Sequence, residues 1–431
     1  MYDMRIKSRT GLLLLALLLL ATPRSYAQVT LASGYVLQPA DALGPDKPYD
    51  FSETALHKAP KGYEAFCIEH YGRHGSRYAY EAYFYQDLWN AFQKADAQGL
   101  LTEQGRRIYT DYRQHYDHYL LHVGELTALG WEQHRKIAER MYDAFPGVFA
   151  RGATVTALAS GSYRSILSMS ACCLSLQARA PRLQIRELQG LAYLKDTHPR
   201  DARNPLLRPW HKKASPLAES PADFQARRVD AAAVLGRLFM DVEAACGEAP
   251  YQTLLGRLYI LTAGMQSLRE EERTCFDGLF SETEFAGMAE WLNYLFYTVY
   301  YGVLPPTASV SDGIIADADR RIRDGERGAT LRFGHDHVLM PLLRLLGING
   351  QDWEAPSPDE VSRHYHIWDC PMAGNIQFVF YRPKAGRSGD ILFKVLLNGR
   401  EATLAIPAAQ GPYYHWQAFK EWYAARIAAL S

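Results

Sequence analysis

Short apolar runs alternate along this chain with longer segments of helical periodicity, and this alternation limits the possible folds most. The strand candidates are Glu64–Glu69, Thr154–Ser160, Ala329–Phe333, Asn375–Tyr381 and Ile391–Leu397. Buried strands that alternate with helices are typical of α/β domains built on a parallel sheet. The sequence therefore predicts an α/β fold with a doubly wound, mostly parallel sheet flanked by helices.

The sequence pattern changes between residues 187 and 300. It contains no strand signal, and the stretches "ADFQARRVDAAAVLGRLFMDVEAA" and "GMAEWLNYLFYTVYYGV" have the pattern of helices. We expect a mainly helical cap domain at 187–300, inserted into a core formed by 28–186 and 301–431. The last two strand candidates are separated only by "RPKAGRSGD", so they are expected to pair in antiparallel fashion at one side of the sheet.

The first 27 residues have the pattern of a secretory signal peptide. Arg5, Lys7 and Arg9 precede the apolar run "LLLLALLLLA", and Ser25-Tyr26-Ala27 is a small-x-small cleavage site. The apolar run is too short for a membrane span, which needs about 20 residues. We therefore expect cleavage after residue 27 and a periplasmic or secreted protein that has no integral membrane segment.

Charge and cysteine content exclude several classes of protein. Beyond residue 27 the chain has 43 Lys and Arg against 46 Asp and Glu, whereas nucleic-acid binders usually have a basic face. Its six cysteines are sparse and irregularly spaced, which argues against a scaffold built on disulfides. A single bridge between Cys246 and Cys275 remains open, and the sequence gives no indication of the oligomeric state.

Charged residues follow three of the predicted strands directly. These clusters are "GRHGSR" after 64–69, "SGSYRS" after 154–160 and "GHDH" after 329–333. Open α/β sheets bind ligands outside the carboxyl ends of their strands. Each cluster is weak evidence alone, but three clusters suited to holding an anion predict a phosphate site.

The chain resembles the histidine acid phosphatases, which include phytases, glucose-1-phosphatases and multiple inositol polyphosphate phosphatases. The resemblance rests on Arg73-His74-Gly75-x-Arg77, on "ELTALGWEQH", on Arg164 in "SGSYRSILS" and on His335-Asp336, in that order. "RFGHDHVLMPLLRLLGI", "NIQFVFY" and "FKVLLNG" extend it from about residue 60 to residue 425.

The resemblance implies a role for each matched residue. His74 would attack phosphorus and form a phosphohistidine, which divides one difficult displacement into two. Arg73, Arg77, Arg164 and His335 would bind the phosphate oxygens, and Gly75 would let the backbone pass close to the phosphate. Asp336 would protonate the leaving oxygen. This chemistry requires neither a metal nor a cofactor.

Two features modify that expectation. Asp336 begins a predicted helix, whose N-terminus lowers the pKa of a carboxyl, whereas a bound phosphate raises it. We therefore expect Asp336 to be protonated chiefly when substrate is bound. The triplet His335-Asp336-His337 resembles the His-Asp form of phytases and acid phosphatases rather than the His-Ala-Glu of the inositol polyphosphate subgroup, so the subgroup stays open.

Further substrate contacts are expected outside the matched motifs. The stretch 182–213 is rich in Lys and Arg, and Lys195 and Arg200 within it could bind additional phosphates of the substrate. Tyr78 follows Arg77 closely and could line the pocket. His70 is as consistent with packing as with ligand contact.

Other readings of the same residues are weaker. Cys67-x5-Arg73 and Cys173-x5-Arg179 have the spacing of cysteine-dependent phosphatases, but both cysteines fall inside predicted strand or helix rather than in a phosphate-binding loop. His115, His118 and His122 have helical spacing, yet no further metal ligand is evident nearby. No GxxxxGK[ST] loop occurs.

The sequence thus predicts an exported phosphomonoesterase that acts on a small-molecule phosphate ester, with an inositol polyphosphate as the first candidate. A broad acid phosphatase or a glucose-1-phosphatase is the alternative. A non-catalytic phosphate- or sugar-binding protein is less consistent, because His74 and Asp336 are both present.

Overall fold

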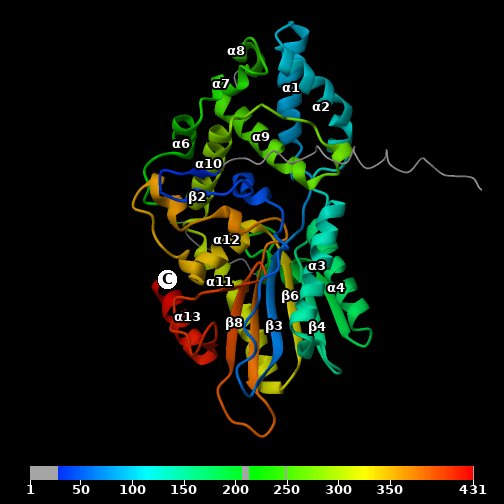
Figure 1. Cartoon of the computed structure of the whole chain (residues 1–431), viewed down its shortest axis with the longest axis vertical. Coiled ribbons are helices and arrows are strands. Elements are labelled where there is room, and N and C mark those ends of the chain that lie inside the picture. Colours follow the sequence, from blue (N-terminus) through cyan, green and yellow to red (C-terminus); the bar gives the residue numbers. More distant parts are fainter. Residues whose placement is uncertain (1–27, 206–212, 248–249, 431) are drawn as a thin grey trace, which may run out of the picture.

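The computed structural model of the 431-residue chain describes residues 28–205, 213–247 and 250–430. The expected signal segment 1–27 lies outside them. Within the described part, a single mixed sheet of eight strands forms the centre of the molecule (Figure 1). Its strands are β3 (Tyr63–Arg73), β4 (Thr154–Ala159), β5 (Gln184–Gln189), β6 (Gly328–Gly334), β7 (Asn375–Pro383), β8 (Leu392–Leu397), β9 (Arg400–Ala402) and β10 (Tyr414–His415).

The strand order is β10-β8-β7-β3-β6-β4-β5, with β9 paired to β8. Strands β3, β6, β4 and β5 are mutually parallel, whereas β7 runs antiparallel to β3 and β8 antiparallel to β7. The five predicted strands and the antiparallel pair are confirmed. In the register of β3 and β6, Arg73 lies opposite Gly334, so these two strands end at the same level.

The central strands are buried on both faces, which explains their nearly continuous apolar sequence. Every residue of β6 is buried, as are the last eight residues of β3. Charged residues are buried among them: Glu69 of β3 and Arg332 of β6 are fully buried and form an ion pair of 2.7 Å. Because the two residues lie on adjacent strands, this pair links β3 and β6 near the ends that carry the candidate site.

Helices cover both faces of the sheet. One face packs against α3 (Ala128–Ala144) and α4 (Tyr163–Arg179), and Ile68 of β3 lies in that core. The other packs against α11 (Leu304–Asp324), α12 (Asp336–Leu345) and α13 (Trp416–Leu430), on the side of Cys67. Figure 1 shows these two layers on opposite sides of the strands.

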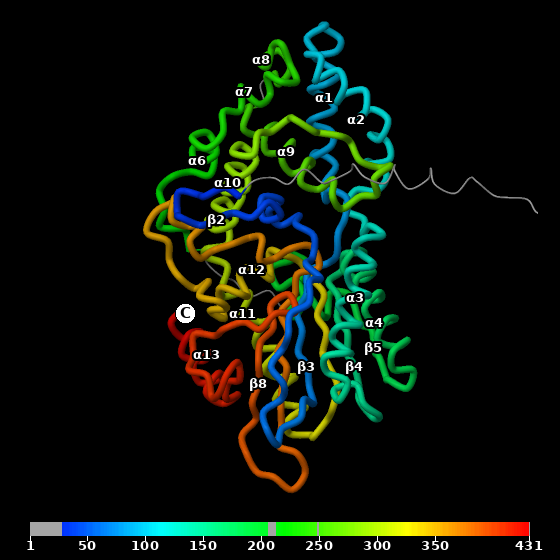
Figure 2. Tube along the Cα trace, in the orientation of Figure 1, coloured from blue at the N-terminus to red at the C-terminus, as the bar shows by residue number. Residues whose placement is uncertain are grey.

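A second group of helices forms the upper end of the molecule in Figures 1 and 2. It contains α1 (Tyr83–Ala97), α2 (Glu103–Leu121), α6 (Pro221–Arg228), α7 (Ala231–Leu235), α8 (Val242–Cys246), α9 (Tyr251–Gly264) and α10 (Glu282–Tyr300). Helix α1 packs against α8 and α9. The helical end is therefore built from two separate chain segments, since α1 and α2 precede the expected insertion at 187–300. The short helix α5 (Leu194–Thr197) and the hairpin of β1 (Val29–Thr30) and β2 (Val36–Leu37) complete the described elements apart from 3-10 turns.

All six cysteines lie within the described residues, and all six are unpaired. The bridge between Cys246 and Cys275 that the sequence left open is not formed. Cys67 lies within β3 and Cys173 within α4, and burial raises the pKa of both thiols. Neither cysteine has the exposed, thiolate-stabilising environment that a cysteine-dependent phosphatase needs.

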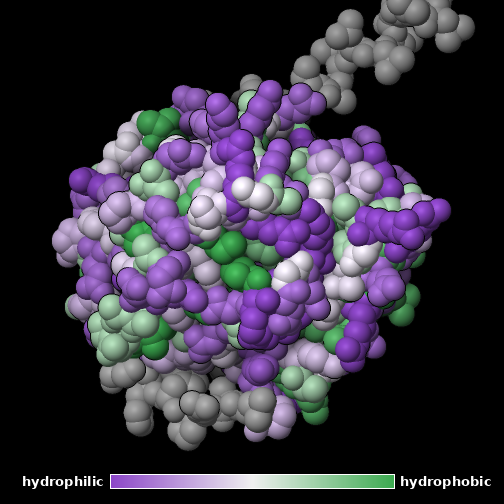
Figure 3. Space-filling view, turned by 90° about the horizontal axis from the view of Figure 1, so that it is seen from below, coloured by the Kyte–Doolittle hydropathy of each residue, from purple (hydrophilic) through white to green (hydrophobic). Residues whose placement is uncertain are grey.

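Of the helices in the described residues, none combines the length and the apolar character needed to cross a bilayer. Figure 3 views the molecule from the lower end of Figure 1, and hydrophilic residues cover most of this face, with hydrophobic residues in small groups.

Candidate active site

The candidate site lies where three parallel strands end side by side. Strands β3, β6 and β4 are neighbours in the sheet, and each runs directly into one of the charged clusters. The structure brings together the side chains of all six residues of the predicted phosphate site: Arg73, His74, Arg77, Arg164, His335 and Asp336.

The backbone on both sides fixes the position of His74. Its N–H donates to Gly334 O at 3.0 Å, and its carbonyl accepts from Ala373 N at 3.0 Å. The ring atom Nδ1 lies 2.9 Å from Gly75 O. A carbonyl can only accept, so Nδ1 carries the proton and Nε2 keeps its lone pair.

His74 is held in the neutral form. Burial lowers its pKa well below the ordinary value, and the positive charges of Arg164, Arg73 and Arg77 lower it further. An uncharged imidazole with a free Nε2 lone pair is a nucleophile that a phosphate dianion does not repel.

Arg73 is fully buried and is anchored at several points. Its Nη1 donates to the carbonyls of Pro45 and of Cys370, the latter at 2.9 Å. Its Nη2 lies 2.9 Å from Asp336 Oδ2. Arg73 therefore links the segment before β3, the segment before β7 and the start of α12 at a single point.

Arg77 and Arg164 are less constrained. Nη1 of Arg77 donates to Tyr78 O at 3.1 Å, and its Nη2 lies 3.7 Å from Asp46 Oδ1. Arg164 is the second residue of α4, and its buried Nε has no hydrogen-bond partner among the described residues. Burial and the charge of Arg77 lower the pKa of Arg164 to about 10. Two cations so close together favour an anion between them.

His335 and Asp336 begin helix α12, where the helix dipole favours a negative charge. Nε2 of His335 lies 3.0 Å from Ser160 Oγ, and burial with neighbouring positive charges lowers its pKa well below the ordinary value. Burial alone raises the pKa of Asp336, but Arg73 and the side chain of His337 outweigh it and leave the pKa well below the ordinary value. The backbone N–H of His337 also donates to Asp336 Oδ1 at 2.7 Å.

The motif "ELTALGWEQH" supports the loop after β3 rather than contacting a ligand. Thr127 Oγ1 donates to Ser76 O at 3.1 Å, and the side chain of Gln133 binds both the N–H of Ser76, at 2.8 Å, and its hydroxyl, at 3.0 Å. A Cβ on Gly75 would lie 2.4 Å from Gly130 O, and one on Gly130 would lie 2.3 Å from Ser76 O. Gly75 is thus required for the close contact with α3, and the contact with phosphate that the resemblance implies stays a prediction.

Three further predicted contacts, Tyr78, Lys195 and Arg200, are not among the described residues that line the cavity beside Arg77 and Asp336. The hydroxyl of Tyr78 is bonded to His118 at 3.0 Å and Glu272 at 3.1 Å, and Tyr80 lines the cavity instead. Lys195 is exposed on α5. Arg200 lies behind the site, where its Nη2 donates to His337 O at 2.7 Å.

His70 and His122, which the sequence also raised as candidates, pack against aromatic rings. His70 is buried against Phe333, and burial lowers its pKa to about 3, which agrees with packing rather than ligand contact. His122 stacks on Tyr78. In the part of the chain that the structure describes, no group of three or more His, Cys, Asp and Glu side chains is arranged to hold a metal ion.

Sequence reasoning missed Asp46. It ends the 3-10 turn η1 (Asp41–Asp46) and is buried beside Arg77, and its Oδ1 has no hydrogen bond to any described residue. Burial raises its pKa, although Arg77 and Arg73 lower it. No strand end or charged cluster marks this position in the sequence, so no signal there could have identified it.

A second unpredicted feature lies on the other side of Asp336. Nε2 of His337 lies 2.7 Å from Nε2 of His198, and Nδ1 of His198 lies 3.1 Å from Asp201. One of the two facing nitrogens must carry a proton and the other must accept it. This pair fixes the third residue of the His-Asp-His triplet.

Solved structures with the same architecture are phosphatases. The multiple inositol polyphosphate phosphatase of Bifidobacterium longum, in its complex with inositol hexasulfate, matches with a TM-score of 0.71 and 18% identity over 90% of this chain and 98% of that chain. Its phosphate complex matches with a TM-score of 0.71 and 19% identity over 90% and 98%. The phytase from D. castellii matches with a TM-score of 0.64 and 13% identity over 95% and 88%.

The chain has the histidine acid phosphatase fold. This confirms the predicted fold class, and at these identities the likeness is one of fold. Comparison with protein-family models and with curated protein sequences gives no match. The three charged strand ends of this chain lie at the carboxyl edge of the sheet, where open α/β sheets bind their ligands.

Proposed function

We propose that the chain is a phosphomonoesterase that works through a phosphohistidine. The observation that carries the proposal is the neutral His74, whose Nε2 is left free by the bond from Nδ1 to Gly75 O and which has three arginines as neighbours. A phosphate monoester is among the slowest substrates to hydrolyse unaided. The clustered guanidinium groups supply the charge stabilisation that such a reaction needs.

The reaction proceeds in two displacements. Nε2 of His74 bonds to phosphorus while the bond from phosphorus to the ester oxygen breaks, and the leaving oxygen takes the proton of Asp336. Water then attacks the phosphohistidine and gives a proton to the Asp336 carboxylate. The electrons of the nitrogen–phosphorus bond return to His74, and inorganic phosphate leaves.

The low pKa of Asp336 in the free protein fits this scheme only if substrate changes it. Arg73 and the hydrogen bond from His337 both stabilise the carboxylate. A phosphate dianion that binds Arg73 compensates the same positive charge and adds a like charge beside Asp336, and both effects raise the pKa. Asp336 therefore gains its proton in the substrate complex.

Two substrate classes have support. The sequence expectation of an inositol polyphosphate is supported by the Bifidobacterium longum protein of the same fold, which was solved with inositol hexasulfate. The alternative, a broad acid phosphatase or a glucose-1-phosphatase, is favoured by the cavity next to the phosphate site, whose described lining is largely apolar. A pure binding protein would not need the free Nε2 of His74 together with a carboxyl at the leaving-group side.

We further propose that the chain is exported and is cleaved after residue 27, with 187–300 acting as a cap over a core of 28–186 and 301–431. The export proposal rests on the sequence "LLLLALLLLA" and Ser25-Tyr26-Ala27. N-terminal sequencing of the protein isolated from its own cell envelope should give Gln28 as the first residue. An intact N-terminus at Met1 would contradict it.

The test of the phosphatase proposal is phosphate release from a panel of esters: inositol hexakisphosphate, glucose 1-phosphate and a chromogenic aryl phosphate. Brief incubation with radiolabelled substrate followed by alkaline quench should trap a phosphoenzyme that is labile to acid, as a phosphoramidate is. His74→Ala should lose both the label and turnover while keeping its circular dichroism spectrum. No release from any ester, or full labelling of His74→Ala, would refute the proposal.

A further inference from the structure

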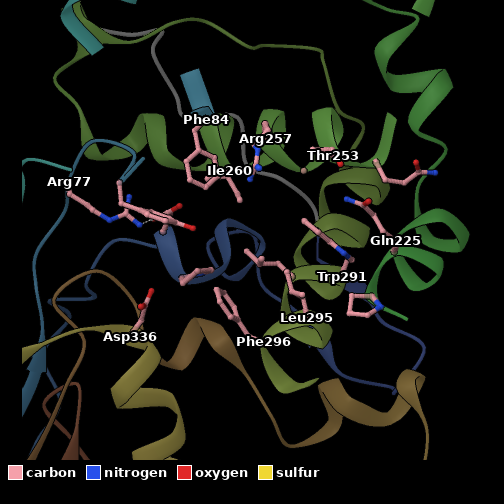
Figure 4. Close-up of a pocket in the computed structure, with 18 residues that line it drawn as sticks. Arg77, Phe84, Gln225, Thr253, Arg257, Ile260, Trp291, Leu295, Phe296 and Asp336 are labelled. Atoms are coloured by element: carbon pink, nitrogen blue, oxygen red, sulfur yellow. Dashed lines mark ion pairs between the residues drawn. The ribbon is translucent and has the colours of Figure 1, made fainter. Parts of the chain in front are cut away.

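A cavity of about 360 Å³ continues from the candidate phosphate site toward the helical end of the molecule. Figure 4 shows Arg77 and Asp336 at one end of it and Gln225 and Thr253 at the other. Its size is in the range of small-molecule sites. Since an ester held by the arginines must extend its alcohol portion somewhere, this cavity is the place for the leaving group.

The walls of the cavity are mainly apolar. Phe84 comes from α1, Ile260 from α9, and Trp291, Leu295 and Phe296 from α10. In Figure 4 Phe84 and Ile260 face Leu295 and Phe296 across the space, and Trp291 lies farther along it. Apolar side chains cannot replace the water around a phosphate dianion, so burying one against them is strongly unfavourable.

The described lining offers little positive charge beyond the phosphate site itself. Its cations are Arg77, which belongs to that site, and Arg257. The guanidinium of Arg257 is already compensated: its Nε donates to Asp87 at 3.3 Å, and the group lies over the rings of Tyr83, at 4.1 Å, and Phe84, at 4.8 Å. A second phosphate in the cavity would therefore meet no uncommitted cation among the described residues that line it.

Asp46 also disfavours a second phosphate in the cavity. It lines the cavity next to Arg77, and its buried Oδ1 has no hydrogen-bond partner among the described residues. As a carboxylate it repels a neighbouring phosphate, and in either protonation state it can hydrogen-bond to a hydroxyl of the substrate. A free hydroxyl or an apolar ring is thus favoured beside the scissile ester.

We propose that the cavity binds an uncharged leaving group with a flat or apolar face, so that the preferred substrate is an aryl or other hydrophobic monoester with a single phosphate. Polyphosphorylated rings are disfavoured by the apolar walls and by Asp46. This inference rests on the proposed phosphatase function and selects the second of its two substrate classes.

The kinetic test compares kcat/KM for 2-naphthyl phosphate, glucose 1-phosphate and inositol hexakisphosphate with the full chain. 2-Naphthyl phosphate should give the highest value. Trp291→Ala should lower that value about tenfold, since a stacked aromatic contact together with its buried area is worth roughly one power of ten. The Ki of inorganic phosphate should stay within about twofold, because phosphate does not reach Trp291. The matched control is Trp422→Ala on α13, outside the cavity lining, and it should change neither quantity.

A gain-of-function variant tests the charge argument. Thr253 is exposed and lines the far end of the cavity, so Thr253→Lys adds a cation there without disturbing the core. It should raise the ratio of kcat/KM for inositol hexakisphosphate over 2-naphthyl phosphate about tenfold, the usual scale for a newly paired charge of this kind. An unchanged ratio, or a wild type that already prefers the hexakisphosphate, would overturn the inference.

Binding separates this inference from the proposed function. Calorimetry with His74→Ala, which keeps the cavity but cannot turn over, should show tighter binding of 2-naphthyl phosphate than of inositol hexakisphosphate. The reverse order would overturn the inference even if the wild type hydrolyses every ester. If the wild type hydrolyses none, the proposed function fails, and the binding order still decides what the cavity accepts.

Discussion

Replacing Gly130 by alanine tests whether helix α3 must touch the loop after β3 for the site to form. The new Cβ would lie 2.3 Å from Ser76 O and 2.8 Å from Ser76 N, and 2.6 Å from Leu126 Cδ1. The leucine can rotate away, but the Ser76 backbone cannot move without moving His74 and Arg77. Helix and loop must therefore separate.

The size of the effect follows from what that separation breaks. Overpacking of this kind costs about 1–3 kcal/mol. Weakening the two bonds between Gln133 and Ser76, at 2.8 and 3.0 Å, adds roughly 1 kcal/mol for each bond lost. The better helix propensity of alanine returns about 1 kcal/mol at most. We expect a net loss of about 2–4 kcal/mol in the free energy of unfolding.

The assay is urea denaturation together with kcat/KM for an aryl phosphate. A shift of about 1 Å in the loop that carries His74 and Arg77 lowers activity by about a hundredfold, so Gly130→Ala should lose both stability and activity. The matched control is Gly264→Ala at the end of α9, where φ is −73° and a Cβ meets nothing within 4 Å. Equal urea midpoints and equal activities for the two variants would refute the reasoning.

Three further predictions concern the charged residues and the rival nucleophile. Cys67→Ser should keep activity, because the thiol lies inside β3 with a raised pKa; loss of phosphate release in this variant would instead favour a cysteine mechanism. Asp336→Asn should slow the hydrolysis of an alkyl phosphate by about 10²–10⁴ but that of 4-nitrophenyl phosphate far less, since the 4-nitrophenolate leaving group needs no proton. Equal losses of rate for the two esters would exclude an acid role. His74 must be neutral to attack, so its low pKa extends activity to acidic pH. Arg164→Gln removes a positive charge that lowers this pKa. The variant should therefore move the acidic limb of the pH profile of kcat/KM to higher pH. A limb that stays in place or moves to lower pH would contradict this.

The strands that carry the site could be predicted because they are buried on both faces. Their apolar runs are nearly continuous, and β3 and β6 extend only a few residues beyond the predicted bounds. Strand β5 was missed for the opposite reason: it is the edge strand, and most of "QIRELQ" is exposed. An edge strand of this kind has no apolar run to distinguish it from a surface loop.

The position of α1 and α2 could not be predicted, because it depends on which surfaces meet in space. Both helices follow the phosphate loop in sequence and have an ordinary amphipathic pattern, which indicates a buried face but not its partner. Their contact with the helical end places Phe84 in the wall of the cavity. The leaving-group side of the site therefore depends on packing that no motif records.

The two carboxyls of the site, Asp46 and Asp336, also differ in whether the sequence could predict them. Asp336 was predicted because it follows a strand end, whereas Asp46 lies in a turn 28 residues before His74 and becomes important only through burial. Arg73 lowers the pKa of both, yet the net shifts are opposite: the pKa of Asp336 is lowered and that of Asp46 is raised. The difference follows from geometry, since Asp336 lies 2.9 Å from Arg73 and accepts a backbone hydrogen bond at 2.7 Å, whereas Asp46 lies 3.7 Å from Arg77.

Opposite shifts in neighbouring carboxyls imply different roles. As the pH falls, Asp46 takes up a proton before Asp336 does in the free protein. In the proposed mechanism, Asp336 acts as the acid only because a bound phosphate compensates Arg73 and raises its pKa. Asp46 needs no such change to hydrogen-bond to an uncharged leaving group. In the proposed mechanism the substrate thus prepares Asp336 as its proton donor, whereas Asp46, which lines the same cavity, can hydrogen-bond to the leaving group without any change from the free protein.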